Sequence, residues 1–379
     1  MQKILVGILL IPCIGIAWNP RGDLNVYYAV SQYLLGGKAA TIYAENEHLG
    51  NFFYGPLGLA LLKPLALLPF SFAHGWWVLL NVVSYFVFWG ALARLFPALF
   101  EKRNRLYFFL VWIASIKPIH ASFQSFNIQL MCAALLLAVE VATRSSRKWS
   151  FWGGFAIAGL VAIKIFPVFV LLYYFLVKSK ELRYGAIAGF ATALIAPVLV
   201  FGFPLGLVMT RDFVLNLFTY HNAYPLAEGT YLLSLPSLLA WLGKVAGVDA
   251  AAAILTKALI VGISAMFFWH TWKRGESLFA WAMALTLMTL LNSVSRVDYF
   301  IFYLPAFCAL LTYRLEKPSL KRWYMVLVGL SLSLIAFVNE WTLQSAALNH
   351  RLEGWRVPVY GMLILCGLLA WVMRERETA

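Results

Sequence analysis

The sequence predicts an all-α, polytopic integral membrane protein with about 12 transmembrane helices. Its composition does not suit a water-soluble fold, because 62% of the 379 residues are apolar and 12% are charged, whereas soluble chains carry about 25% charged residues. The mean hydropathy is +0.79. The chain also holds 15 Trp and 18 Tyr, whose amphipathic rings favour the depth of the lipid headgroups.

The apolar runs that predict the spans are residues 3–18, 74–97, 106–119, 125–143, 149–163, 166–178, 185–209, 250–272, 277–294, 298–313, 323–341 and 356–373. Short basic clusters such as Arg144–Lys148 and Lys178–Arg183 separate them. The positive-inside rule assigns these clusters to the cytoplasm, which places both termini on the cytoplasmic side of an inner or plasma membrane. Residues 1–18 are predicted to be an uncleaved first span, because no small-x-small cleavage site precedes Asn19.

Charge and motifs exclude several functions. The net charge is +14, but the basic residues are scattered between spans and do not form the single basic face of a nucleic-acid-binding domain. Each cysteine stands alone in an apolar run, so neither a disulfide nor a metal-ligand pair is expected. Walker, GxGxxG, HExxH and Asp-x-Asp motifs are absent from the sequence, and we predict no cofactor and no metal.

Residues 149–178 must enter and leave the membrane between two basic clusters. About 30 residues are too few for two full spans at 1.5 Å per residue. We therefore expect two short or re-entrant helices broken near Lys164-Ile165-Phe166-Pro167. Irregular backbone at membrane depth requires cover by protein or by a water-filled cavity, so this break predicts a cavity in the outer half of the bilayer.

Three longer segments are predicted to lie outside the cytoplasm: residues 19–73, 210–249 and 342–355. In the first, apolar and aromatic residues recur at helical spacing from Asp23 to Leu35, and Gly36 follows. This pattern predicts an amphipathic helix on the membrane surface. Residues 56–70 are expected to form a second interfacial element. No internal repeat or soluble linker is found, so residues 1–379 are expected to form one membrane domain.

Asp23 is the first candidate for chemistry, because this carboxylate follows the first predicted span directly, at the outer edge of the bilayer. An Asp before an apolar-periodic run is also an ordinary helix N-cap, which stabilises a helix by about 1 kcal/mol. Position alone therefore leaves both capping and catalysis open.

Several outward-facing cations suit an anionic lipid headgroup. Lys164 lies within an apolar run, where an ionisable group usually faces a cavity or a partner, although a snorkelling structural lysine is the alternative. Lys117 is predicted at the outer turn between the third and fourth spans, where the alternative is an exposed loop cation. Arg296 and Asp298 form either a ligand site or a simple ion pair. Weaker candidates are Arg211, His120 and His221.

Three stretches of the chain carry motifs that resemble those of a known family. They are Asp23-Leu24 with Tyr27-Tyr28, Phe53-Tyr54-Gly55-Pro56 and Lys63-Pro64; Lys164-Ile165-Phe166-Pro167; and Ser293-Val294-Ser295-Arg296-Val297-Asp298-Tyr299. In order and spacing they resemble glycosyltransferase family 87. These proteins are bacterial GT-C type mannosyltransferases that use polyprenyl-phosphate-mannose.

The resemblance implies that Asp23 is catalytic. It implies an inverting transfer of a hexosyl unit, mannosyl in the family, from a polyprenyl-phosphate sugar to a lipid or glycan acceptor in glycolipid or cell-envelope biosynthesis. Candidate ligands of the donor phosphate are Lys164, Arg296, Arg211, Lys117 and His221. Candidate sugar or acceptor ligands are Tyr27, Tyr54, Asn127, Asp298 and Tyr299. Membrane lipids are expected partners.

The chain departs from the family pattern in three places. Where the family has Gly-Gln-x-Asn, the chain has Gln124-Ser125-Phe126-Asn127, which keeps only the Asn. Asp298 stands where the family has a His, and Arg296 replaces the Trp that precedes it. If that His binds the donor phosphate, Arg296 or His221 has to supply the cation here, and an altered donor or acceptor becomes plausible.

A transporter or flippase of a lipid-linked or anionic solute is the main alternative. It predicts internal repeats and ionisable groups at the midplane of the membrane, whereas the chain has no repeat and places only Lys164 and Lys257 there. A non-catalytic membrane scaffold would leave the acidic first loop unexplained. A GT-C enzyme that transfers arabinose, glucose or an aminosugar also stays open.

Overall fold

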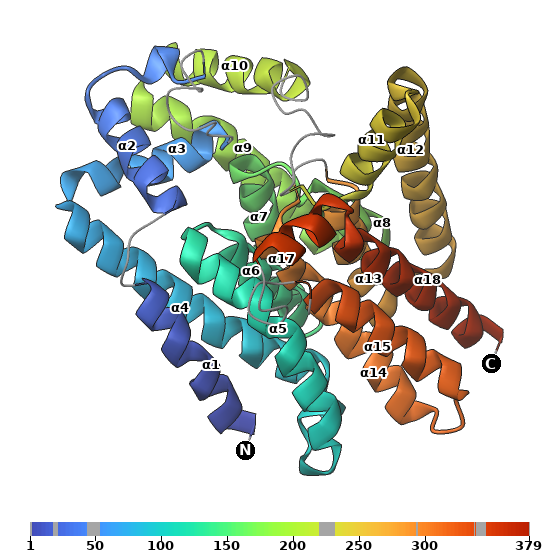
Figure 1. Cartoon of the computed structure of the whole chain (residues 1–379). Coiled ribbons are helices and arrows are strands. Elements are labelled where there is room, and N and C mark those ends of the chain that lie inside the picture. The colour runs from blue at the N-terminus through green and yellow to red at the C-terminus, as the bar shows by residue number, and fades with distance from the viewer. Residues whose placement is uncertain are drawn as a thin grey trace. The chain divides into compact units, whose positions relative to one another are not determined.

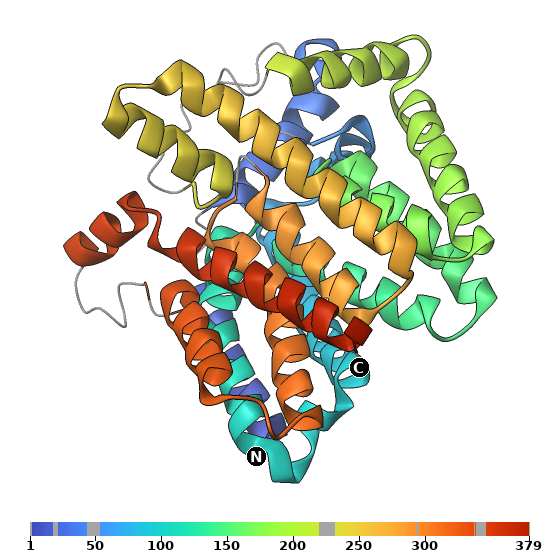
Figure 2. The ribbon, with the colours of Figure 1, turned by 90° about the vertical axis from the view of Figure 1, so that its right-hand side faces the viewer.

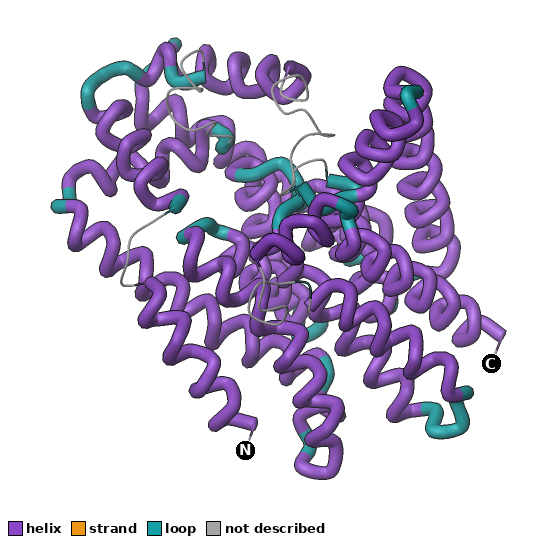
Figure 3. Tube along the Cα trace, viewed as in Figure 1, coloured by secondary structure: helices purple, strands orange, loops and turns teal. Residues whose placement is uncertain are grey.

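The structure is a computed structural model that describes residues 2–17, 22–43, 54–219, 232–292, 295–336, 338 and 346–378. Within these ranges every regular element is a helix (Figure 1, Figure 3). The helices that are long and apolar enough to cross a membrane are Phe70–Leu95, Lys102–Ser125, Lys180–Phe201, Asp249–Arg274 and Val357–Arg376. An all-α, polytopic membrane protein is therefore confirmed, whereas the count of twelve spans stays a prediction.

The described residues divide into two compact units, and each unit draws on separate stretches of the chain. The first unit comprises Met1–Leu9, Leu92–Ala121 and Tyr224–Ala379, and the second comprises Leu10–Ala91 and Ser122–Ala223. Three helices begin in one unit and end in the other: α1 (Gln2–Ala17), α4 (Phe70–Leu95) and α5 (Arg105–Ser125).

The second unit contains the predicted surface helix and the predicted broken pair. Its further elements are α2 (Asp23–Leu35), a 3-10 turn (Ala39–Thr41), α3 (Pro56–Leu62) with a 3-10 turn (Lys63–Leu67), α6 (Gln129–Thr143), α7 (Arg147–Ile163), α8 (Val168–Val177), α9 (Lys180–Phe201) and α10 (Leu205–Thr219). As predicted, α2 is amphipathic, since it buries Leu24, Tyr27 and Leu34 on one face.

The break between α7 and α8 falls at residues 164–167, as the sequence predicts. The 10 residues of α8 span about 15 Å at 1.5 Å per residue, which is half of the roughly 30 Å hydrocarbon core of a bilayer. The helix is therefore too short to cross a membrane alone, and the prediction of a short helix beside a break is confirmed.

Glycines hold α7 against α9. A Cβ on Gly154 would overlap the carbonyl oxygen of Leu182, and a Cβ on Gly185 would overlap that of Phe151. Small residues let two helix backbones approach closely, which drives helix association inside membranes where the hydrophobic effect is weak. The position of α7 is consequently fixed by α9 at these contacts.

The first unit includes η4 (Pro97–Phe100), η5 (Lys102–Asn104), α11 (Leu235–Ala246), α12 (Asp249–Arg274), α13 (Leu278–Leu290), η7 (Val297–Tyr303), α14 (Leu304–Glu316), α15 (Arg322–Ala336), α17 (Ala346–Gly354) and α18 (Val357–Thr378). Figure 2 shows α11 and α12 side by side as a hairpin. A capping box of Ser234 and Ser237 begins α11, and Gly247, at φ 69°, ends it.

The core of the first unit is built around α13, whose residues Phe279–Leu290 are all buried. By contrast, α12 exposes large apolar side chains such as Ile254, Val261 and Met266. A helix that is apolar on its exposed face suits contact with lipid, whereas one that is buried all round suits a protein core.

Two predicted boundaries are wrong. Lys117 lies inside α5 and not at an outer turn, because α5 continues to Ser125. Pro118 does not end the helix, since backbone groups in an apolar setting find partners most readily by continuing it. The predicted span 185–209 is divided between α9 and α10. The segment 210–249, predicted to lie outside the cytoplasm, contains the end of α10 and all of α11, and its side of the membrane stays a prediction.

Candidate active site

Asp23 is the first residue of α2, and its neighbour Gly22 is the N-cap. Gly22 has φ 129°, a conformation that favours glycine. A Cβ at this position would overlap the backbone of Ser125 at the end of α5. Gly22 therefore seats the start of α2 against that helix end and leaves Asp23 half-buried beside it. A carboxylate in the first turn of a helix is stabilised by the helix dipole, which favours its ionised form.

Tyr27 extends the site from α2 toward α3. It lies one turn after Asp23, so both side chains share one side of the helix. The hydroxyl of Tyr27 is 2.5 Å from that of Tyr54, which precedes α3. The ring of Tyr27 lies 5.0 Å from the ring of Trp77 on α4, and Nε1 of Trp77 donates to the carbonyl of Phe126 at 2.8 Å. These contacts connect α2, α3, α4 and the turn after α5.

Lys164 occupies the break directly after α7. Its ammonium lies 5.2 Å from the ring centre of Tyr54 and 5.8 Å from that of Phe166. Cation–π contact of this kind stabilises an ammonium in apolar surroundings. The backbone N–H of Gly55 donates to the carbonyl of Ile163 at 2.9 Å, which fixes Tyr54 beside the break. The two tyrosines thus link the helix that carries Asp23 to the segment that carries Lys164.

Asn127 belongs to the same unit and orders the turn between α5 and α6. Its Oδ1 accepts from the backbone N–H of Gln129 at 2.9 Å, and its Nδ2 donates to Oγ of Ser125 at 2.7 Å. Phe126 in this turn has φ 53°. The side chain of Asn127 is fully buried. These contacts give Asn127 a part in shaping the turn against which Gly22 packs, and a role in sugar binding stays a prediction.

Arg211 lies on α10 and forms an exposed ion pair with Asp212 at 2.8 Å. Nearby, the hydroxyl of Tyr43 donates to the carbonyl of Tyr54 at 2.9 Å. Burial raises the pKa of Tyr43 well above its ordinary value, and the charge of Asp212 adds to the shift. Tyr43 is therefore a neutral donor that supports Tyr54. His221 lies outside the described residues.

Lys117 is held by groups of the first unit. Its Nζ lies 3.6 Å from Oε1 of Glu353, donates to the carbonyl of Val338 and sits 6.0 Å from the ring centre of Phe300. About a tenth of its side chain is exposed. These contacts give Lys117 an anionic partner within the protein, so phosphate binding by Lys117 stays a prediction that has to compete with Glu353.

Arg296 and Asp298 form the ion pair that the sequence leaves open, with Nε and Oδ1 3.5 Å apart. Both belong to the first unit, and Asp298 and Tyr299 are buried in η7. Their assignment to donor or acceptor binding stays a prediction.

His74 and Trp77 are two residues of this site that sequence reasoning missed. Both lie on α4, three residues apart and therefore on one side of the helix. The ring centre of His74 is 5.2 Å from that of Phe126, and the ring is parallel to that of Phe70. The spacing of the two residues was a usable signal, but both fall where an aromatic membrane interface is also expected.

An apolar cavity of about 90 Å³ is lined by residues of α5, α14 and α15, among them Leu110, Phe307 and Leu332. None of the candidate side chains lines it. In the described part of the chain, no three His, Cys, Asp or Glu side chains gather where they could hold a metal ion.

Two comparisons with known proteins bear on identity. The family model of glycosyltransferase family 87 matches residues 52–294. No curated protein matches the chain.

Proposed function

The chain belongs to glycosyltransferase family 87 and is a membrane glycosyltransferase, and on this premise we propose its donor, its chemistry and its catalytic base. The donor is a polyprenyl-phosphate sugar, mannosyl by the family resemblance. The acceptor is a lipid or glycan on the extracytoplasmic side of the membrane. Asp23 is the base, and the transfer inverts the anomeric carbon.

The proposal is carried by the connection between Asp23 and Lys164. An acid in the first turn of α2 and a cation at the break after α7 lie on elements of one unit, joined by the contact of Tyr27 with Tyr54. A carboxylate for the acceptor and a cation for the phosphate are the two groups that the reaction needs.

In the proposed reaction, the oxygen of the acceptor hydroxyl forms a bond to the anomeric carbon while the bond from that carbon to the phosphate oxygen breaks. The electron pair of the broken bond stays on the phosphate, and the hydroxyl proton passes to the carboxylate of Asp23. Attack from the face opposite the phosphate inverts the configuration. Because a lipid phosphate is a weak base, it leaves without a proton donor, so one carboxylate suffices. Glycoside hydrolysis, in contrast, uses two.

Cations stabilise the charge that grows on the phosphate, most strongly in a partly dry site. Lys117 and Arg296 belong to the first unit, and Arg211 lies in an exposed ion pair with Asp212. Lys164 is preferred because it lies beside Tyr54, in the same unit as Asp23.

The test is transfer by the purified full-length protein in lipid vesicles supplied with radiolabelled polyprenyl-phosphate-mannose. Label is expected to move into a glycolipid fraction. Asp23→Asn should lower the rate by at least about 10²-fold, the usual loss when a general base is removed. Asp249→Asn is a matched control, because Asp249 is also an acid in the first turn of a helix and is exposed; its rate should equal that of the wild type.

Retention of more than about a tenth of the rate by Asp23→Asn would remove this residue as the base. If label is transferred only from a different polyprenyl-phosphate sugar, the donor sugar is not mannose and the proposed reaction class stands. Absence of transfer from every polyprenyl-phosphate sugar tested would contradict the proposed donor.

A further inference from the structure

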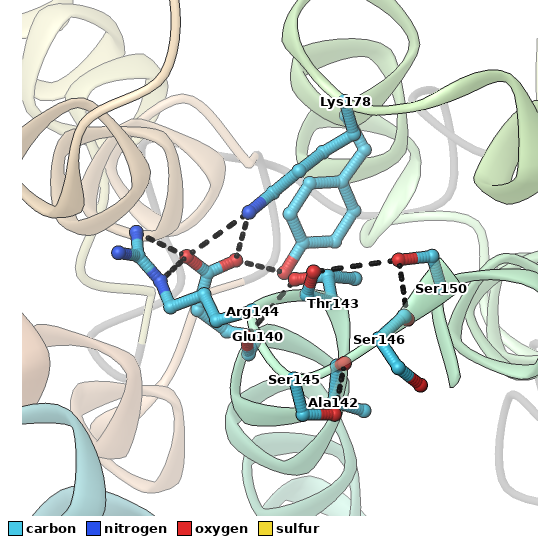
Figure 4. Close-up of polar contacts among 9 residues, drawn as sticks. Glu140, Ala142, Thr143, Arg144, Ser145, Ser146, Ser150 and Lys178 are labelled. Carbon is cyan, nitrogen blue, oxygen red and sulfur yellow. Dashed lines mark hydrogen bonds and ion pairs between the residues drawn. The ribbon is translucent and has the colours of Figure 1, made fainter. Parts of the chain in front are cut away.

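Glu140, near the end of α6, is a buried carboxylate outside the candidate site that contacts groups of two helices (Figure 4). Its Oε1 lies 2.7 Å from both Nε and Nη2 of Arg144, the C-cap of α6. Nζ of Lys178 lies 3.4 Å from each carboxylate oxygen. The hydroxyl of Tyr174 on α8 donates to Oε2 at 3.0 Å. No part of the Glu140 side chain is exposed, and 4% of that of Lys178 is.

This cluster requires an explanation beyond stability. Removing two charges from water costs about as much as their attraction returns, so apolar residues in place of a buried ion pair are often as stable. What the charges add is a defined geometry. A carboxylate that is bonded to donors on two helices permits one relative position of those helices. A buried ion pair of this kind therefore points to a requirement for one defined helix position.

The helix that the cluster positions is α8. Glycine contacts already fix α7 against α9, whereas α8 is short and exposes Leu172 and Leu176. Tyr174 and Lys178 are four residues apart, so they present one face of α8 and its C-cap to Glu140. The opposite end of α8 begins at the break that carries Lys164.

A helix of 10 residues behaves as a rigid rod of about 15 Å. A shift at Lys178 is therefore passed to the start of α8 and to the break before it. On the other side, α6 begins two residues after Asn127, in the turn beside Ser125. Through Glu140, α6 connects the turn that supports α2 with the far end of α8.

We propose that Glu140 is a positioning residue, which holds α8 through Tyr174 and Lys178 so that the break presents Lys164 beside Tyr54. The inference rests on the proposed function, in which Lys164 binds the donor phosphate.

The principal variant is the double replacement Glu140→Met with Lys178→Met. It removes both buried charges. Arg144, the other cation beside Glu140, keeps access to water because 38% of its side chain is exposed, so the variant should fold, although Tyr174 loses its hydrogen bond to Glu140. Glu140→Gln alone, in contrast, would leave Lys178 buried opposite a neutral amide. We expect an unfolding temperature only slightly below that of the wild type, because Tyr174 loses one hydrogen bond. We also expect a fall in kcat of about 10-fold or more, since a misplacement of about 1 Å can cost 10²-fold. The donor KM should change less than kcat.

Glu181→Gln is the matched control. Glu181 faces Arg147 at 3.9 Å at the exposed start of α9, at the end of the unit where Glu140 lies. Its loss should leave kcat unchanged. A double methionine variant with wild-type kcat would overturn the proposal. It would show that apolar packing replaces the ion pair fully, so that the pair only stabilises the fold.

A comparison in a Lys164→Gln background shows whether the methionine pair lowers kcat by misplacing Lys164 or by another route. In a Lys164→Gln background, the methionine pair should lower kcat by less than about 2-fold, because the group that it misplaces is already gone. If the fold-losses in kcat from Lys164→Gln and from the methionine pair multiply in full, the proposal is overturned.

A structural readout keeps the inference testable if no transfer is found. After replacement of the native cysteines, spin labels at Leu61→Cys and Ile165→Cys, both exposed positions of one unit, report the distance from α3 to the break. The methionine pair should broaden or shift the distance distribution. An unchanged distribution would refute positioning by Glu140, whereas a changed one in a protein without transfer would contradict only the proposed function.

Discussion

Replacing Gly55 by alanine tests whether the contact between α3 and the break governs the reaction. Gly55 is the N-cap of α3, with φ −66° and ψ 165°, so the backbone conformation tolerates alanine. A Cβ there would overlap the carbonyl oxygen of Ala162 and lie 3.4 Å from Cε1 of Phe213. The obstacle is backbone that cannot turn aside, so α3 has to move away from α7 and stretch the hydrogen bond from Gly55 to Ile163.

The magnitude follows from two opposing terms. Loss of chain freedom in the unfolded state favours alanine by about 0.4–1 kcal/mol, and overpacking disfavours it by about 1–3 kcal/mol. The free energy of unfolding should therefore fall by between about 0 and 2.6 kcal/mol. The larger effect is expected on rate, because a shift of about 1 Å between Tyr54 and Lys164 can cost 10–10²-fold in transfer.

Initial rates of transfer and thermal unfolding measure the two effects separately. Gly75→Ala on α4 is the control, because a Cβ there meets nothing within 4 Å. Gly58→Ala should lie between them, since its Cβ would touch only side-chain atoms at 3.3 Å. A Gly55→Ala protein that transfers at the wild-type rate would refute the claim that the distance from Tyr54 to Lys164 matters.

Three further outcomes are expected. Lys164→Gln should lower kcat by about 10²–10³-fold at saturating donor, with partial recovery in Lys164→Arg, and an unchanged kcat would exclude this lysine as a phosphate ligand. Tyr54→Phe should cost about 1 kcal/mol in denaturant unfolding, and adding Tyr27→Phe should cost little more, because one hydrogen bond joins the two; additive losses would show separate partners. Lys117→Met should destabilise the fold by about 3–5 kcal/mol by leaving Glu353 buried and unpaired, and adding Glu353→Gln should recover most of the loss; a fully stable single variant would contradict a structural ion pair.

Local patterns predicted much of the second unit. The helical spacing from Asp23 to Leu35, closed by Gly36, fixed the bounds of α2 within a residue. The break at Lys164 followed from length alone, since the apolar stretch is too short for two spans. Family membership followed from the order of motifs, and the family model agrees over residues 52–294.

Contacts between distant segments were beyond the reach of such patterns. Lys117 pairs with Glu353 in another part of the chain, and a proline beside it made the helix interior resemble a turn. Glu140 stands in an apolar run with no periodic signal, and its partners on α8 are chosen by packing. Gly22 has a positive φ and packs so closely on Ser125 that a Cβ would overlap its backbone. In each case the deciding partner is set by tertiary structure and not by neighbours in sequence.

The interleaved make-up of the two units has a consequence for biogenesis. A nascent chain that has emerged as far as Ala223 already contains every segment of the second unit, including both Asp23 and Lys164. The first unit, in contrast, has received only Met1–Leu9 and Leu92–Ala121 by then and lacks the buried helix α13. Because chains fold as they are synthesised from the N-terminus, the half with the proposed chemistry can assemble in the translocon before ribosomes have made the core of the other.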